Sequence, residues 1–227
     1  MSGYAIVDQL KIDTHITFIR INPTDIALTL KEVFASLADL AWISTFDKQY
    51  LRDGFSIRAE ASVAYIAKNI IKDTDDSITS NSGEYVISEL ARKATVDNLA
   101  YFDIPLAELI KIKDVGNHGF DFYSKNQGEI LLFGEAKYNA RDNAYGVAFE
   151  QIIRFEREKQ DSSDIIDIDQ FCCVNSKNNF AKGDKGFIAA FASKKTTTEK
   201  LIDGIKKNKD YKEAIKFKEL ICVAVNI

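Results

Sequence analysis

Hydrophobic and polar positions change their spacing several times along the 227-residue chain, and each change predicts an element. Apolar and β-branched residues alternate with polar ones from Ile12 to Ile21, which predicts a strand. Helical spacing of apolar residues then predicts helices over about residues 25–40 and 56–71. The polar stretch 73–82 follows no period, so we expect an exposed loop there.

A regular order of elements follows this loop. We expect a helix over 83–98, strands over 105–113, 120–124 and 129–138, a helix over 142–159, a strand over 185–193, a basic helical region and a strand over 219–226. The first three of these strands are predicted to be antiparallel, with a hairpin loop at 125–128. The predicted fold class is α/β, an α+β mixed sheet with helices on both faces. Residues 1–80 form its N-terminal α/β segment and residues 81–227 its core.

Three charged residues fall on two neighbouring strands of this core. Asp121 lies on one strand, and Glu135 and Lys137 lie on the next. Glu135 and Lys137 are two positions apart, so their side chains point to the same face of the sheet. The apolar run Leu131–Phe133 precedes them, which indicates a buried strand. A convergent cluster of two carboxylates and one ammonium group is therefore predicted.

Such a cluster fits the chemistry of phosphodiester hydrolysis. Mg²⁺ and Mn²⁺ prefer oxygen ligands, and Asp121, Glu135 and the backbone carbonyl of Ala136 could supply them. Lys137 could orient or deprotonate the attacking water and offset negative charge. The alternatives are a solvated edge pair for Glu135 and Lys137, and a simple turn residue for Asp121.

The motif Gly119-Phe120-Asp121, thirteen further residues and then Glu135-Ala136-Lys137 resembles the PD-(D/E)XK nuclease superfamily. The resemblance implies a restriction-endonuclease-like core. It also implies that a glutamate on the preceding helix joins the metal site, and Glu84 is the best match, with Glu89 in reserve. A polar residue on the following helix is expected near the site, which points to Gln151 and Arg154.

The segments Gly83-Glu84, Asn117 to Asp121 and Gly134 to Tyr138 are more narrowly similar to the nuclease subunit of the Hachiman anti-phage system. That similarity implies DNA as the substrate and a superfamily-2 helicase as the protein partner. It also implies a role in bacterial antiviral defence. Residues 1–80 carry no motif of their own, and partner docking is our hypothesis for them.

Other residues are candidates for contact with nucleic acid. His118 could contact phosphate or transfer a proton, although a histidine in a Gly-Asn-His-Gly turn more often supports the backbone. The segment 194–218 holds nine lysines and four acidic residues, so it could bind a phosphate backbone or simply form a solvated helix face. Its candidate residues are Lys194, Lys195, Lys206 and Lys207.

Composition limits the remaining possibilities. The formal charge of −4 argues against a polycation that coats nucleic acid, but it allows a local basic groove. Three cysteines without a disulfide framework predict reduced thiols in a cytoplasmic protein, and no apolar run predicts contact with a membrane. A catalytically silent nucleic-acid-binding or scaffold subunit, or an RNase-type toxin that uses the same site, stays open as an alternative function.

Overall fold

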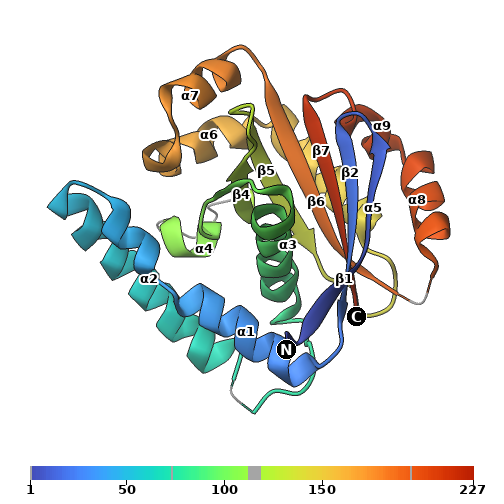
Figure 1. The fold of residues 1–227 in the computed structure, drawn as a ribbon, viewed down its shortest axis with the longest axis horizontal. Helices are drawn as coiled ribbons and strands as arrows, with labels where there is room; N and C mark the ends of the chain where they lie inside the picture. The colour runs from blue at the N-terminus through green and yellow to red at the C-terminus, as the bar shows by residue number, and fades with distance from the viewer. Residues whose placement is uncertain (1, 73, 112–118, 195) are drawn as a thin grey trace.

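The computed structural model describes residues 2–72, 74–111, 119–194 and 196–227, which build one seven-stranded sheet (Figure 1). In space the strands follow the order β1-β2-β7-β6-β5-β4-β3. Strands β2, β7, β6 and β5 are parallel neighbours, whereas β1, β4 and β3 join by antiparallel pairing. The protein is therefore a mixed α/β protein, as the sequence predicts. The strands are β1 (Tyr4–Asp13), β2 (Ile16–Pro23), β3 (Phe102–Asp103), β4 (Phe122–Lys125), β5 (Leu131–Lys137), β6 (Lys185–Ser193) and β7 (Glu219–Asn226).

Helices cover the sheet on both sides. In Figure 1, α3 crosses in front of the sheet and α5 lies behind it. Their apolar residues face the strands, and α5 is buried at positions such as Phe149 and Ile152. No helix within the described ranges has an apolar stretch that could cross a bilayer. The helical segments are α1 (Ile26–Ala38), η1 (Ala41–Thr45), α2 (Gln49–Asn69), α3 (Gly83–Leu99), α4 (Ala107–Ile110), α5 (Tyr145–Arg157), α6 (Gln160–Asp167), η2 (Asp169–Phe171), α7 (Val174–Ala181), α8 (Thr198–Lys207) and α9 (Lys209–Ala214).

The N-terminal eighty residues share the sheet with the rest of the chain. Strand β2 pairs in parallel with β7, so Thr17 lies opposite Ile221. Buried side chains of α1 and α2 belong to the same hydrophobic core as those of β5, β6 and β7. The boundary at residue 80 stays a prediction, and spatially the two segments form one continuous layer structure.

Two predicted strands are wrong. The segment from Ile12 to Ile21 is not one strand. It contains the end of β1, a tight turn at Thr14 and His15 where the chain reverses, and most of β2. The expected strand over 105–113 begins instead with the short helix α4, closed by a bond from Lys111 N to the carbonyl of Ala107. Its Ala-Glu-Leu-Ile sequence favours a helix, and residues 112 and 113 lie outside the described residues.

The other predicted elements exist, several of them with shifted ends. Strands β6 and β7 have the predicted bounds, and α3 ends one residue later than expected. Helix α2 begins at Gln49 rather than near residue 56. Strand β4 begins at Phe122 rather than at residue 120, which leaves Asp121 just ahead of the strand. This shift matters for the site, because Asp121 lies outside β4 and is held to β5 by one backbone and one side-chain hydrogen bond.

Candidate active site

The predicted charged residues meet where β5 ends. Glu135 and Lys137 lie at the C-terminal end of β5, and Asp121 lies across from them, just before the start of β4. The Phe122–Gly134 pairing sets this register. Glu84 reaches the same place from the first turn of α3. The structure thus brings all four predicted side chains together.

Asp121 is held by the backbone of the neighbouring strand. Its N–H donates to the carbonyl of Gly134 at 2.9 Å, and its Oδ2 accepts from the N–H of Ala136 at 2.8 Å. Asp121 retains some exposed surface, yet the protein around it raises the pKa of its carboxyl to about 6, mainly by desolvation. The ammonium of Lys137 and the Ala136 N–H oppose this shift.

The same geometry orients the carbonyl of Ala136. In a strand, the N–H and C=O of one residue point to the same side. Because the N–H of Ala136 points to Asp121, its carbonyl points away from β6 and toward the edge where Asp121 lies. The predicted backbone oxygen is therefore directed to the carboxylate cluster.

Glu135 is the most unusual member of the cluster. Its side chain is completely buried, and its Oε2 has no hydrogen-bond donor among the described residues. Lys137 Nζ lies 2.7 Å from Oε1, and this charged contact offsets part of the cost of burial. Desolvation and the nearby Asp121 raise the pKa of Glu135 well above its ordinary value. A buried carboxylate in this condition is costly unless a cation compensates it.

Lys137 is the ammonium at the centre of the cluster. Nζ lies 2.7 Å from Glu135 and 3.4 Å from Glu84, whose side chain is 47% exposed. Burial alone lowers the pKa of Lys137, but Glu135 and Asp121 outweigh it and the net shift is upward. Lys137 is therefore positively charged at neutral pH.

The donor set fits a divalent cation. Asp121, Glu135 and Glu84 together carry two more negative charges than Lys137 neutralises when all are ionised. All their donors are oxygens, which Mg²⁺ and Mn²⁺ prefer. Within the described ranges, no three His, Cys, Asp or Glu side chains are already grouped closely enough to hold a metal. The fit therefore rests on the unsatisfied Oε2 of Glu135 and on the sign of the local charge.

A second buried network, which the sequence does not predict, holds the residue that precedes Asp121. Asp164 on α6 is 1% exposed, and its Oδ2 accepts from the N–H of Phe120 at 2.8 Å and from the hydroxyl of Tyr123 at 2.9 Å. Its Oδ1 pairs with Lys111 Nζ at 2.7 Å. A Cβ on Gly119 would collide with both Lys111 and Asp164. Gly119 is thus required for this close approach.

Several predicted nucleic-acid contacts make no hydrogen bond to the cluster in the described part of the chain. On α5, Gln151 is half-buried and Arg154 exposed, and neither bonds to the four site residues in the described part of the chain. Lys194 donates to the carbonyl of Ile227 at 2.8 Å, so it holds the C-terminus. His118 and Lys195 lie outside the described residues.

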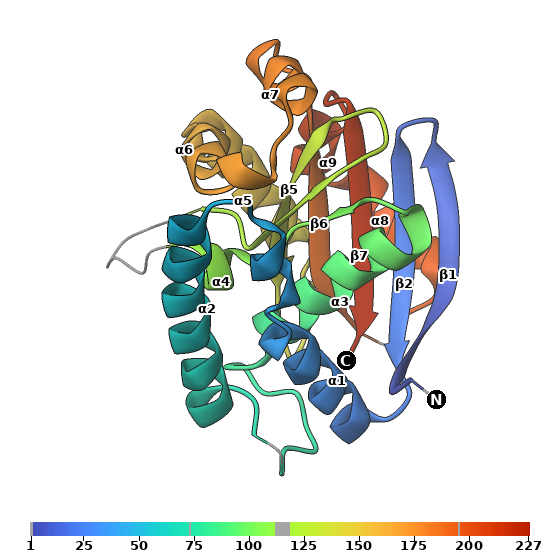
Figure 2. The ribbon, with the colours of Figure 1, turned by 60° about the vertical axis from the view of Figure 1, so that its left-hand side comes forward.

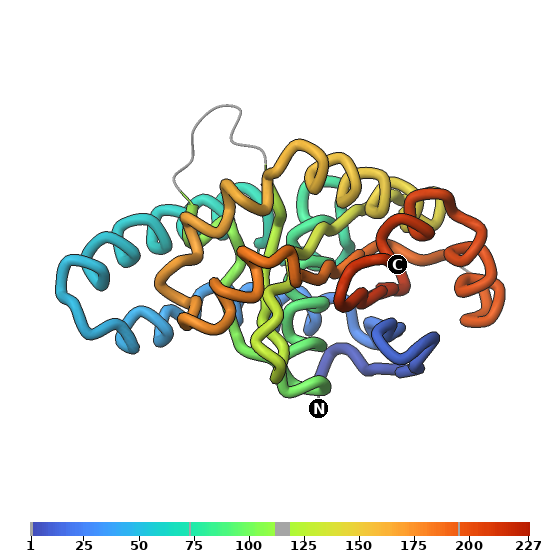
Figure 3. The backbone as a smooth tube through the Cα atoms, turned by 90° about the horizontal axis from the view of Figure 1, so that it is seen from above, coloured from blue at the N-terminus to red at the C-terminus, as the bar shows by residue number. Residues whose placement is uncertain are grey.

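Lys206 and Lys207 lie on a different side of the molecule from β5 (Figure 1). They end α8, whose first residue Thr198 is hydrogen-bonded to Arg20 of β2 and to Asp8 of β1. Figures 1 and 3 show α8 at the β1–β2 side of the molecule, while β5 lies beyond β7 and β6. The assignment of these two lysines to nucleic-acid binding stays a prediction.

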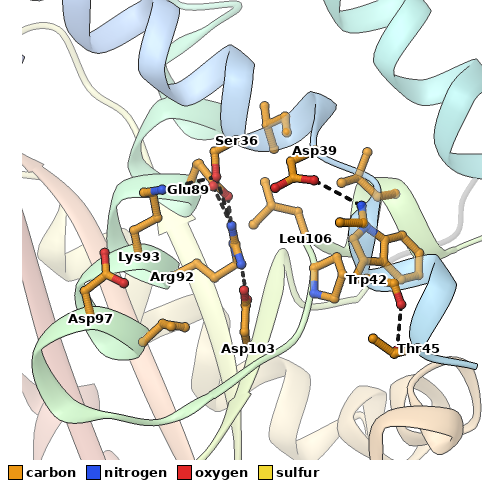
Figure 4. A pocket seen from close by; sticks show the side chains of 15 residues that line it. Ser36, Asp39, Trp42, Thr45, Glu89, Arg92, Lys93, Asp97, Asp103 and Leu106 are labelled. Atoms are coloured by element: carbon orange, nitrogen blue, oxygen red, sulfur yellow. Dashed lines mark hydrogen bonds and ion pairs between the residues drawn. The ribbon is translucent and has the colours of Figure 1, made fainter.

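A cavity of about 430 Å³ lies on another part of α3 (Figure 4). Arg92 crosses it and bonds to Glu89, Asp103 and Ser36. Trp42 forms part of its wall. Glu89 is fully buried against Arg92, so it takes no part in the Glu135 cluster and the reserve assignment to the metal site is wrong. None of the four site residues lines this cavity.

Comparison of the chain with protein-family models, with curated proteins and with solved structures gave no match. The residues and their geometry therefore carry the functional interpretation.

Proposed function

We propose that the protein is a metal-dependent nuclease that hydrolyses phosphodiester bonds at the Asp121–Glu135–Lys137 cluster. The observation that carries the proposal is Glu135, a fully buried carboxylate that lies beside a second carboxylate and has Lys137 as its cationic partner. Two carboxylates held together at such a desolvated place, with pKa values raised by burial, are characteristic of a functional site rather than a structural one.

Asp121, Glu135, the carbonyl of Ala136 and Glu84 would hold Mg²⁺ or Mn²⁺. A bound divalent ion supplies Lewis-acid activation of the phosphoryl group and of the attacking water. The protein's own part is positional: the Ala136 N–H fixes Asp121, and the β4–β5 register places it opposite Glu135.

Lys137 contributes a positive charge directly to the cluster. Since the carboxylates raise its pKa, Lys137 acts as a proton donor to substrate oxygens and offsets developing negative charge. This assignment favours charge stabilisation over removal of a proton from water, because a protonated ammonium cannot accept one.

The order of elements around the cluster supports membership of the PD-(D/E)XK superfamily. Helix α3, the β4–β5 hairpin, α5 and then the parallel strand β6 follow one another as in the core that the resemblance implies. We extend the proposal to DNA as substrate, to a superfamily-2 helicase as partner and to antiviral defence in the cytoplasm. These three parts rest on the similarity of Gly83-Glu84 and Gly134 to Tyr138 to the Hachiman nuclease subunit.

The test is cleavage by the purified chain, alone and with any co-purifying protein. Linear, circular and single-stranded DNA and the matching RNAs are incubated with Mg²⁺, Mn²⁺ or chelator. We expect cleavage of DNA with metal and none with chelator, and loss of cleavage in folded Glu135→Gln and Lys137→Ala variants. Glu150→Gln is the matched control, because this exposed residue of α5 is neither in the cluster nor among the candidate nucleic-acid contacts.

Each failure has a distinct meaning. Undiminished cleavage by either variant would overturn the site. Retarded migration of DNA without cleavage under every metal would identify a binding or scaffold subunit. Cleavage of RNA alone would identify the RNase-type alternative.

A further inference from the structure

An exposed apolar stripe runs along the outer face of α2. Tyr50, Ile57 and Tyr65 are 65%, 73% and 48% exposed, which is unusual for large apolar side chains on a single helix face. The opposite face of α2 is the one that packs on the protein, through Phe55 and Ile66. The stripe therefore faces outward while the helix itself is firmly anchored.

Small residues separate the large ones. Gly54 and Ala61 stand between them, so the order along the face is large, small, large, small, large. We call Tyr50, Gly54, Ile57, Ala61 and Tyr65 the α2 stripe. Its spacings of three and four residues keep all five on one side of the helix. A Cβ placed on Gly54 would meet nothing within 4 Å, so the space above it is open to a second helix.

This order reads nearly the same in both directions from Ile57. A second α2 laid antiparallel across the first would place Tyr50 opposite Tyr65, and Gly54 opposite Ala61. The two-fold axis would then pass between Ile57 and Arg58. Small residues facing one another let the two helices approach closely. A surface that is complementary to itself in this way is what a two-fold interface requires.

The charges at the two ends of the helix favour the same arrangement. Asp47 precedes the helix and Lys68 lies in its last turn, and both are exposed. In the antiparallel pairing Asp47 of one chain lies opposite Lys68 of the other. A parallel pairing would instead set Asp47 against Asp47 and Lys68 against Lys68. Opposite charges across an interface fix orientation more than they add affinity.

We propose that the α2 stripe is a homodimer interface, in which the α2 helices of two copies pack antiparallel about a two-fold axis near Ile57. One helix from each chain is a small interface, so the dissociation constant is on the order of micromolar. The proposal is independent of the nuclease assignment, because it uses no residue of the Glu135 cluster.

The position of α2 in the molecule allows such a dimer. Figures 2 and 3 show α2 at the periphery, at the opposite end of the molecule from α8. Strand β5, which carries Glu135, lies inside the sheet between β6 and β4. The dimer therefore leaves each site on its own chain.

Sedimentation of the full-length protein across a concentration series tests self-association. We expect a monomer–dimer equilibrium in the wild type, with a dissociation constant raised about tenfold or more by Ile57→Asp. Ile166→Asp is the matched control, since Ile166 on α6 is 76% exposed and lies off the stripe. A wild type that stays monomeric throughout, or an Ile166→Asp variant as weakened as Ile57→Asp, overturns the proposal.

Two further variants test the orientation. Lys68→Glu should weaken the dimer, and Asp47→Lys combined with Lys68→Glu should restore it. Cysteines at Tyr50 and Tyr65 give the second test: under mild oxidation, chains with Tyr50→Cys should crosslink to chains with Tyr65→Cys. Neither variant should crosslink to itself, and the wild type sets the background from its own cysteines. Self-crosslinking of each variant would reveal a parallel pairing and contradict the proposal.

Discussion

Asp164 on α6 accepts a 2.8 Å hydrogen bond from the backbone N–H of Phe120, the residue immediately before Asp121. The same carboxylate binds Lys111 and Tyr123. A residue forty-four positions away in sequence therefore positions the turn that presents Asp121 to Glu135.

Replacement of Asp164 should destabilise the protein. Asp164→Ala leaves the Lys111 ammonium and the Phe120 N–H without their buried acceptor, which costs about 3–5 kcal/mol. Urea unfolding followed by circular dichroism measures the loss. Ser163→Ala on the exposed side of the same helix should change stability by less than about 0.5 kcal/mol. Equal effects of the two variants would show that the network is not structural.

The metal-free protein should lose stability as the pH rises. The pKa of Asp121 is about 6 in the folded state, and burial raises the pKa of Glu135 well above its ordinary value, so the folded state binds more protons than the unfolded state. Stability is therefore greatest below the unfolded pKa values and falls as the pH rises through the folded ones. Unfolding free energies between about pH 4 and 7 in chelator measure this slope.

Two comparisons make the pH experiment specific. Glu135→Gln removes one of the two groups and should flatten the slope. Added Mg²⁺ should reverse the trend, because it binds the deprotonated carboxylates and stabilises the folded state. A wild-type protein whose stability rises between these pH values would contradict the raised pKa values.

Glu84 should matter less than Glu135. Glu84 is half-exposed and lies 3.4 Å from Lys137, whereas Glu135 is buried 2.7 Å from it. We expect Glu84→Gln to lower the cleavage rate by about 10- to 100-fold and Glu135→Gln to remove cleavage below detection. Single-turnover rates on one DNA substrate give both values. A larger loss of rate in Glu84→Gln than in Glu135→Gln would show that the main metal ligand lies on α3 rather than on β5.

Gly134 should not tolerate a side chain. Gly134 immediately precedes Glu135, and a Cβ on it would lie 2.4 Å from the ring of Phe122 on β4. Gly134→Ala should therefore cost roughly 1–3 kcal/mol through overpacking. Gly146→Ala on α5, where the nearest atom is 3.6 Å away, should instead stabilise the helix by about 1 kcal/mol. Thermal unfolding of the two variants beside the wild type measures the difference.

The local pattern of the sequence accounts for much of the fold. Strands β6 and β7 have the predicted bounds because their long apolar runs leave no competing period. The chain reversal at Thr14 and His15 was missed, because alternating residues continue on both sides of a tight turn. Helix α4 was missed for another reason: four residues are too few to show a helical period.

By itself, the sequence determined which residues can act together within one strand. Glu135 and Lys137 share a face because side chains alternate along β5, and this holds before any tertiary structure exists. The order of the strands, the contact of Asp164 with Phe120 and the side of the molecule on which Lys206 lies could not be inferred in this way.

Only the tertiary structure decided those features, since they depend on segments far apart in the chain. Packing of α6 against the β4 entry buries Asp164 beside Lys111, and insertion of β2 next to β7 carries α8 away from β5. Local pattern fixes which side chains share a face. Long-range packing fixes what each face meets, because burial and charge pairing are properties of the assembled core.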